Sequence, residues 1–223
     1  DGLTWTCQIE AKKSDKRVDY FYSVRNCCGI KCSEWKTITH RLDLNTKASQ
    51  HIIVEDLWHE IPCDTYLYSS AFTDCVNRRA EGSVKPLAYD KALRLVVRAP
   101  QLHSGARLAL TGKGAVLGDW DLKKALHMTE HNHNEWIVDI DGDALNANDK
   151  EVGLGNNNKI CSKLVHELEF KFVAFSDKGD EMWETCENRT LTLEPLEQNE
   201  VRVVALDQSF YALCDEKVAG TLI

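Results

Sequence analysis

Two tryptophans of this chain stand among small and charged residues rather than within apolar strands. Trp120 follows Gly118 and Asp119, and Trp183 precedes Glu184. Water drives the large apolar surface of an indole into a core, so an indole in such surroundings is typical of a flat surface offered to a ligand. A sugar ring fits this chemistry, because its C–H face can lie on an indole while its hydroxyls bond to nearby polar side chains.

Polar side chains that could complete such a site lie close to the second tryptophan. In the segment 169–172, Glu-Phe-Lys-Phe, strand-like alternation puts both phenylalanines on one face and Lys171 on the other. The Lys171 ammonium then points to solvent, and Asn188 adds an amide that can donate and accept. We expect Trp120, Trp183, Lys171 and Asn188 to act together, since one stacked ring contributes only about 0.5–1.5 kcal/mol.

Three further side chains are weaker candidates for ligand contacts. Glu184 adjoins the second tryptophan and is expected chiefly to pair with Arg189, but it is kept as a possible contact. Trp136 lies between strand-like residues, which favours a place in the core, and it is kept with Trp35 as a possible secondary contact. A competing interpretation makes both platform tryptophans caps of the core.

The acidic residues do not suggest catalysis. Glycoside transfer needs two carboxylates that face each other across the bond that breaks, and no such pair can be identified. Asp139, Asp141 and Asp143 alternate along one segment, which is typical of a solvated face. We predict no catalytic residue and no cofactor for this chain.

Composition favours a soluble, folded protein with neither nucleic acid nor a membrane as partner. Among 223 residues, 35 acidic and 27 basic side chains give a formal charge of −8, without a dense Lys and Arg cluster. No apolar run approaches the ~20 residues of a membrane span, and residues 1–5 lack the form of a signal peptide. Nine cysteines, an odd number, fit a reduced, cytoplasmic setting.

No metal site is predicted from the cysteines and histidines. The cysteines of the segment 27–32 lack the paired spacing of a zinc site. His127, His131 and His133 have a spacing that suits a helix, but nothing around them supports one.

Short segments of alternating apolar and polar residues dominate the chain and predict an all-β fold. Over residues 91–208 about seven such strands are divided by turns that contain glycine. No long stretch has helical periodicity. The expected architecture is an immunoglobulin-like antiparallel β-sandwich.

An internal repeat relates the start of the chain to this sandwich. Trp35 and Arg41 are six residues apart, as are Trp183 and Arg189, and each arginine opens an alternating run. The segment 19–22 likewise corresponds to 169–172. The two copies therefore share one order of strands.

The repeat predicts how the chain is divided. Trp5 corresponds to Trp136, so the first copy lacks the strands that precede this tryptophan in the second. We expect residues 1–54 to be the C-terminal part of a degenerate second sandwich, incomplete at its N-terminus. Residues 55–90 lack regular alternation and are expected to be a connector.

Several ordered elements together resemble the family 20 starch-binding modules. They are Leu117-Gly118-Asp119-Trp120, Trp136, Glu169-Phe170-Lys171-Phe172, Trp183-Glu184 and Asn188-Arg189. The resemblance covers residues 91–208, and residues 1–54 resemble the later half of a degenerate module of the same family. It implies two tandem modules whose ligand is an α-1,4-glucan such as starch, glycogen or maltodextrin. It also implies Trp120 and Trp183 as stacking platforms, with Lys171 and Asn188 bonded to hydroxyls.

The tandem arrangement resembles the N-terminal region of disproportionating 4-α-glucanotransferases. Residues 209–223 are similar to the segment that leads into the family 77 glycoside hydrolase barrel. The resemblance implies a non-catalytic region that targets a catalytic domain in cis to polysaccharide. Two alternatives stay open: a regulatory or scaffold protein that binds glucan without any transferase, and a sandwich used for protein contacts.

Overall fold

The structure is nearly all β-strand, as predicted. The computed structural model describes residues 4–12, 14–34, 39–44, 51–58, 89–99, 102, 105–132, 135–147, 150–152, 163–207 and 210. Within them the helical elements are α3 (Gly142–Asn146) and the 3-10 turns η1 (Ala115–Leu117) and η2 (Leu122–Lys124). No helix in this part of the chain is long and apolar enough to span a membrane.

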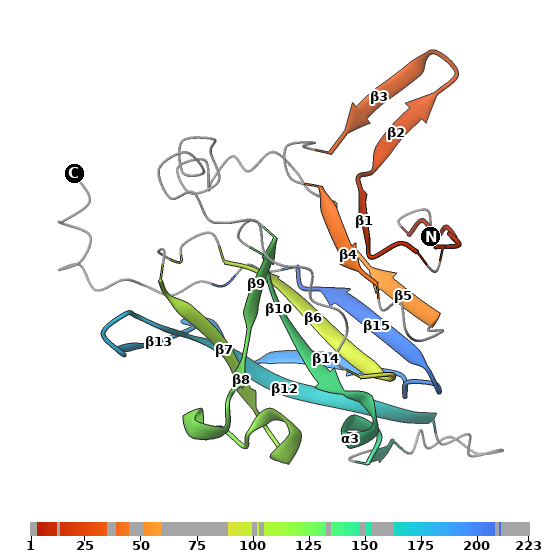
Figure 1. Cartoon of the computed structure of the whole chain (residues 1–223). Coiled ribbons are helices and arrows are strands. Elements are labelled where there is room, and N and C mark those ends of the chain that lie inside the picture. The colour runs from red at the N-terminus through yellow and green to blue at the C-terminus, as the bar shows by residue number, and fades with distance from the viewer. Residues whose placement is uncertain are drawn as a thin grey trace, which may run out of the picture.

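Two β-sheets make up the main body of the molecule (Figure 1). The first has the order β5 (His51–Glu55), β15 (Glu200–Ala205), β6 (Ala92–Arg98), β10 (Glu135–Asp141) and β9 (Thr129–Asn132). The second is built along β12 (Lys163–Phe175), which pairs with β11 (Lys150–Val152), β7 (Arg107–Gly112), β13 (Glu181–Trp183) and β14 (Arg189–Leu193). Strand β8 (Leu126–His127) pairs with the outer side of β7.

The core lies between these sheets and follows the period of two expected for strands. Phe170 and Phe172 of β12 point inward and are 1% or less exposed. They meet the inward residues of β6, Leu93 and Leu95, in one cluster of buried side chains. Burying a large apolar side chain stabilises a fold by about 1.5–3 kcal/mol, so this cluster holds the two sheets together.

Strand β15 breaks the antiparallel pattern that the sequence predicted. It runs parallel to both of its neighbours, β6 and β5. Parallel neighbours need a crossover, and β15 follows β14, which lies in the other sheet. The first sheet is therefore mixed, whereas the described pairs of the second are antiparallel.

The packed body continues beyond the end that the sequence gave to the sandwich. Phe210 is 2% exposed in the core cluster, and its N–H donates to the Arg98 carbonyl at 2.8 Å. The sequence analysis assigned Phe210 to residues 209–223, the segment expected to lead into a catalytic domain. At least Phe210 of that segment belongs to the core of the sandwich. Residues 211–223, and 59–88 of the predicted connector, lie outside the described residues.

Residues 1–54 do not form a separate sandwich within the described part of the chain. Strand β1 (Arg17–Tyr20) pairs with β4 (His40–Asp43), and β2 (Ser23–Asn26) forms a projecting hairpin with β3 (Gly29–Ser33), as Figure 1 shows. Strand β5 joins the main body instead. Trp5 is 91% exposed and belongs to no strand, so its predicted correspondence with Trp136 is wrong.

Local contacts nevertheless support the internal repeat. The Glu34 carboxylate accepts the Tyr22 N–H at 2.6 Å, while the Glu34 N–H donates to the Tyr22 carbonyl at 3.1 Å. Glu184 and Phe172 make the same two bonds at 3.1 and 3.3 Å. Both glutamates are 3% exposed and stand 12 residues after their partners. The two segments therefore share a local fold.

Strand pairing changes the register of the repeat. Tyr20 is opposite His40 across β1 and β4, just as Phe170 is opposite Arg189 across β12 and β14. The His40 Nε2 also lies 3.0 Å from the buried carboxylate of its own copy. The equivalent of Arg189 is therefore His40, and the sequence match of Arg189 with Arg41 is off by one residue.

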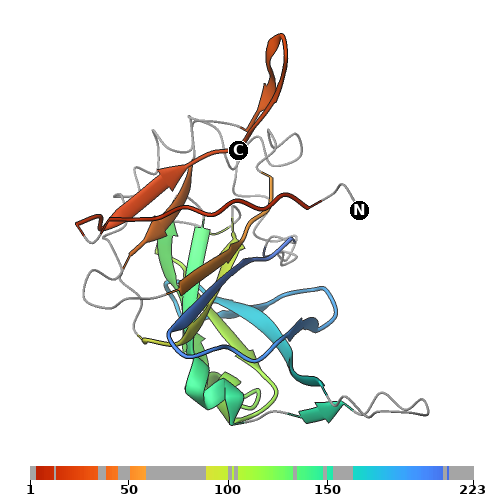
Figure 2. The ribbon, with the colours of Figure 1, turned by 90° about the vertical axis from the view of Figure 1, so that its right-hand side faces the viewer.

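The N-terminal segment covers the outer face of the five-stranded sheet, and Figure 2 shows β5 alongside β15. Side chains of β4 and β5 pack there in a small second core with β6 and β15, namely Leu42, Ile52, Val54, Ala92, Val96, Val201 and Val203. Polar contacts come from β9, where His131 Nδ1 lies 3.3 Å from an Asp43 oxygen. The neighbouring Asn132 Nδ2 donates to the Thr39 carbonyl at 2.8 Å. Strands β4 and β5 are thus docked on the sandwich.

This docking is predicted to weaken as the pH falls. Burial is the largest influence on His131 and lowers its pKa below the ordinary 6.5, although the Asp43 carboxylate opposes this. The unfolded chain then takes up a proton before the folded chain does, so stability is full above pH 6.5 and is lost as the pH falls through the folded pKa. Urea unfolding should show the parent losing up to about 1.4 kcal/mol per pH unit more than His131→Gln.

The exposed His127 supplies the matched control. His127→Gln should keep the pH dependence of the parent. If His131→Gln kept it as well, His131 would not be the group that titrates.

Candidate functional site

A tight loop at the end of β7 presents Trp120. The Trp120 N–H donates to the Gly112 carbonyl at 3.0 Å, which folds the loop back onto the strand that it leaves. Asp119 and Trp120 have φ values of 52° and 64°, in the left-handed region that side chains other than glycine rarely adopt. Gly118, with φ 83°, precedes them. The loop therefore fixes the backbone of Trp120, whose side chain is half-buried.

Lys171 lies beside this loop on the outer face of β12, the face turned away from the core. It stands opposite Thr111 of β7, and opposite residues of paired strands share a face. Thr111 is fully buried, and its hydroxyl donates to the Leu117 carbonyl of the loop at 3.2 Å. The loop thus covers the strand next to Lys171, which places Trp120 and Lys171 in one neighbourhood.

Trp183 lies on the same outer face. It is opposite Val173, two residues along β12 from Lys171. Such diagonal neighbours are about 7–8 Å apart, within reach of long and aromatic side chains. Trp183 is 36% exposed, so part of its ring is open to a ligand.

Asn188 completes the predicted set through a contact that the sequence alone did not identify. The exposed Asn188 donates from Nδ2 to Glu169 Oε1 at 2.8 Å. Glu169 is two residues before Lys171 and therefore shares its outer face. The structure thus brings the four predicted residues to one side of β12, with Glu169 among them. The i, i+2 spacing of Glu169 and Lys171 was the signal that could have found it.

Glu184 is a structural residue, and its prediction as a glucan contact is wrong. It is 3% exposed, and Arg189 donates to its two oxygens at 2.6 and 3.0 Å. The Arg189 guanidinium lies 5.0 Å from the centre of the Phe172 ring on the core side of the sheet. Because neighbours along a strand face opposite ways, Glu184 points inward where Trp183 points outward. Its expected pairing with Arg189 is confirmed.

One of the two secondary candidates lies in the core and not at this surface. Trp136 is 7% exposed in the core cluster, and its indole N–H has no hydrogen-bond partner there. A ring at that depth cannot act as a platform for a ligand in solution, so its inclusion as a contact is corrected. Trp35 lies outside the described residues.

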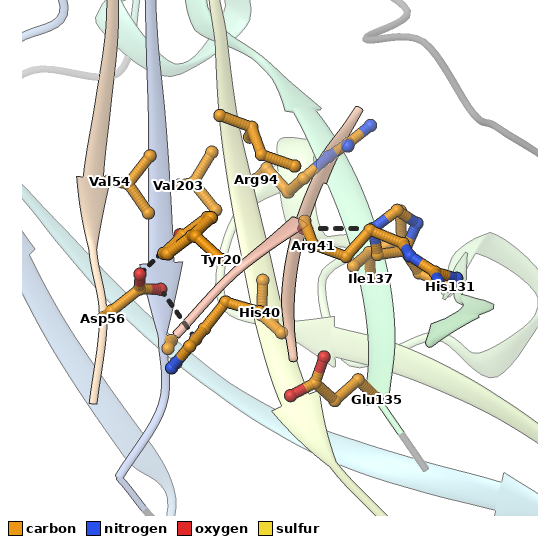
Figure 3. A pocket seen from close by; sticks show the side chains of 13 residues that line it. Tyr20, His40, Arg41, Val54, Asp56, Arg94, His131, Glu135, Ile137 and Val203 are labelled. Atoms are coloured by element: carbon orange, nitrogen blue, oxygen red, sulfur yellow. Dashed lines mark hydrogen bonds and ion pairs between the residues drawn. The ribbon is translucent and has the colours of Figure 1, made fainter. Parts of the chain in front are cut away.

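A second hollow lies between the N-terminal segment and the five-stranded sheet (Figure 3). Two of its polar groups bond to each other, since the Tyr20 hydroxyl donates to Asp56 at 2.5 Å, and the Tyr22 hydroxyl next to the hollow donates to the same carboxylate at 2.9 Å. Burial and the Asp56 carboxylate raise the pKa of both hydroxyls, so they remain neutral donors. The His40 ring stacks on Tyr20 with 5.2 Å between ring centres. This hollow belongs to the contact of β1, β4 and β5 with the sandwich.

No metal centre is found among the described residues, where no three His, Cys, Asp or Glu side chains converge. Cys27 and Cys28 are exposed at the tip of the projecting hairpin. The alternating aspartates are partly engaged rather than free on a solvated face. Asp139 takes two bonds from Arg94, at 2.6 and 2.8 Å, and Asp141 caps the start of α3.

Comparison with known families decides the identity of the sandwich. Residues 92–202 match the family model CBM_20, described as a starch binding domain. The chain contains a starch binding domain of this family. The match includes strands of both sheets and the positions of Trp120, Lys171, Trp183 and Asn188. No curated protein matches the chain.

Solved structures with some similarity to the starch binding domain include two enzymes and one isolated module. They are a γ-CGTase from alkalophilic Bacillus clarkii (18% identity, TM-score 0.35), a family 15 glucoamylase from Hypocrea jecorina (17%, 0.35) and the family 20 CBM of a maltotetraose-forming amylase from Pseudomonas saccharophila STB07 (13%, 0.32). The matches cover 56%, 56% and 52% of this chain. They span only 16% and 18% of the two enzymes, but 99% of the isolated module.

The close packing at Gly118 leads to a prediction for the Trp120 loop. A Cβ at Gly118 would lie 2.7 Å from the Lys124 carbonyl oxygen, and φ is 83°. At Gly114 φ is 91°, but nothing lies within 4 Å of the added Cβ. Gly114→Ala should cost about 1–3 kcal/mol from the backbone alone, because φ 91° and ψ 160° are adopted almost only by glycine, and the close contact should make Gly118→Ala cost more. Equal losses in thermal unfolding would show that the contact with Lys124 is easily relieved.

The inward pair of Glu184 and Arg189 leads to a prediction for stability. Glu184→Gln removes the carboxylate that pairs with the Arg189 guanidinium, whose side chain is only 10% exposed. Breaking a buried pair costs about 3–5 kcal/mol, and urea unfolding at neutral pH should show a loss approaching this range. The exposed Glu187 is the control, and Glu187→Gln should change stability by less than about 0.5 kcal/mol. A small loss in both variants would contradict a structural role.

Proposed function

We propose that residues 91–208 bind α-1,4-glucans, namely starch, glycogen or maltodextrin, without catalysing their conversion. The match to a starch binding domain over residues 92–202 is the observation that carries this proposal. The bonds of the site are those expected for a sugar: two indoles stack on ring faces, while Lys171 and Asn188 meet hydroxyls.

The proposed contacts predict a weak single site. Each indole contributes about 0.5–1.5 kcal/mol by analogy with aromatic pairs, and both must engage one chain to give useful affinity. Tethering makes such weakness useful, because a module held beside an active site raises the local concentration of its substrate. Targeting is therefore the physical effect that we assign to this domain.

We further infer that the natural protein is a cytoplasmic 4-α-glucanotransferase with two starch-binding modules ahead of its catalytic domain. The shared geometry of Glu34 with Tyr22 and of Glu184 with Phe172 supports a tandem origin of residues 17–56. The resemblance of the chain to the N-terminal region of such transferases supports the catalytic partner. A disproportionation assay on the natural full-length protein with maltodextrin tests it, and glucan binding without transfer would favour a regulatory or scaffold protein instead.

Calorimetry with a linear maltodextrin tests glucan binding by the chain itself. Trp120→Ala and Trp183→Ala should each weaken binding by roughly two- to twelvefold, the equivalent of about 0.5–1.5 kcal/mol. Lys171→Ala should also weaken maltodextrin binding, because it removes the ammonium that donates to a sugar hydroxyl. Loss of heat in the double tryptophan variant, with folding intact by circular dichroism, is the expected result.

Two variants elsewhere on the chain provide matched controls. Trp5 is 91% exposed and lies outside the matched residues 92–202, and Lys178 is exposed in the turn after β12. Trp5→Ala and Lys178→Ala should bind as the parent does. If the parent gave no heat and no retention on amylose, glucan binding would be refuted.

A further inference from the structure

Glu169 links the loops that frame the proposed glucan site. Its Oε1 accepts Asn188 Nδ2 at 2.8 Å, and its Oε2 lies 3.8 Å from Lys113 Nζ. The Glu169 carbonyl also accepts the Lys113 N–H at 2.8 Å. Lys113 begins the loop that ends at Trp120. One residue of β12 is therefore bonded to the loops on both of its sides.

The bond to Glu169 determines which end of the Asn188 amide is free. An ionised carboxylate only accepts hydrogen bonds, so it selects the NH2 end of a neighbouring amide. Asn188 Oδ1 makes no hydrogen bond within the described part of the chain. An unrestrained, exposed asparagine could instead present either end.

A fixed amide of this kind suits a carbohydrate. Lys171 carries only donors, whereas the free Asn188 Oδ1 is an acceptor. Neighbouring hydroxyls of a sugar can then accept from the ammonium and donate to the amide oxygen at the same time. If the site offered only donors, the second hydroxyl would find no acceptor for its own proton.

We propose that Glu169 is a positioning residue of the glucan site, which holds Asn188 with its carbonyl oxygen toward the ligand. This inference rests on the proposed binding of α-1,4-glucan at the outer face of β12. Glu169 acts through Asn188 and the Lys113 loop. Its effect is on affinity and not on the fold, because its side chain is 36% exposed.

Substitution of the Glu169 carboxylate by an amide tests whether Glu169 selects the end of Asn188 that faces the ligand. Glu169→Gln can pair with either end of Asn188, so the acceptor is no longer selected, and maltodextrin affinity should fall roughly three- to tenfold. Glu167, exposed two residues earlier on the same strand and face, gives the control. Glu167→Gln should bind as the parent does, and both variants should unfold at the same urea concentration as the parent.

A double substitution separates positioning from a general effect of charge. Asn188→Asp alone sets two carboxylates against each other and should bind poorly. In Glu169→Gln with Asn188→Asp, the glutamine NH2 donates to the aspartate and leaves one aspartate oxygen free as an acceptor. The double variant should therefore bind more tightly than Asn188→Asp alone. A weaker double variant overturns the proposal.

Nuclear magnetic resonance reports the same bond without ligand. The side-chain NH2 signals of Asn188 should shift in Glu169→Gln and stay in place in Glu167→Gln. If the parent binds maltodextrin but Glu169→Gln binds equally well, positioning by Glu169 is refuted while glucan binding stands. If the parent does not bind at all, both are refuted.

Discussion

The two faces of β12 are the constraint on which the rest of the structure depends. Two of its even-numbered residues, Phe170 and Phe172, are 1% or less exposed between the sheets. Because successive side chains of a strand alternate, that burial forces Glu169 and Lys171 to the opposite face. A shift by one residue would bury the lysine and expose the phenylalanines, so the register of the core also fixes the composition of the proposed site.

The same alternation gives Trp183, the last residue of β13, and the residue after it different roles. Trp183 points outward and is partly open, whereas the next residue, Glu184, turns inward to Arg189 and the Phe172 N–H. The inward pair ties the end of β13 to β12 and to the start of β14. A charged pair buried in this way carries a desolvation cost that only good geometry offsets, and the three hydrogen bonds at Glu184 supply that geometry. Trp183 is thus positioned by the buried pair of Glu184 and Arg189, which lies on the other face of the sheet from the proposed ligand.

The N-terminal segment repeats the hydrogen bonds of the buried glutamate with a different side chain as its second partner. Glu34 and Tyr22 reproduce the bonds of Glu184 and Phe172, but His40 takes the place of an arginine. Arginine offers five N–H donors in a planar fork, whereas a histidine ring offers at most two. The local fold of the first copy is therefore retained with a different ring nitrogen contact to the glutamate.

Local patterns in the sequence predicted the features that depend on neighbours along the chain. The alternation of 169–172, the outward Lys171 and the glycine-containing turn before Trp120 belong to this class. The partners of β15 and the docking of β5 do not, because each depends on strands far away in sequence. The register of the repeat failed for a related reason: the loop before β4 is one residue longer than its counterpart, and equal spacing between Trp and Arg concealed this.

The backbone of the Trp120 loop explains why a platform can be both partly exposed and well placed. Two consecutive residues with positive φ are unfavourable by about 1–2 kcal/mol each, so they persist only where surrounding bonds impose them. Here the Asp119 N–H bonds to the Gly114 carbonyl and the Trp120 N–H to the Gly112 carbonyl, both at 3.0 Å. The conformational cost of ordering the loop is met in folding rather than in binding. A flexible loop would meet it at each encounter with a ligand, and the small contribution of one indole would leave little net affinity.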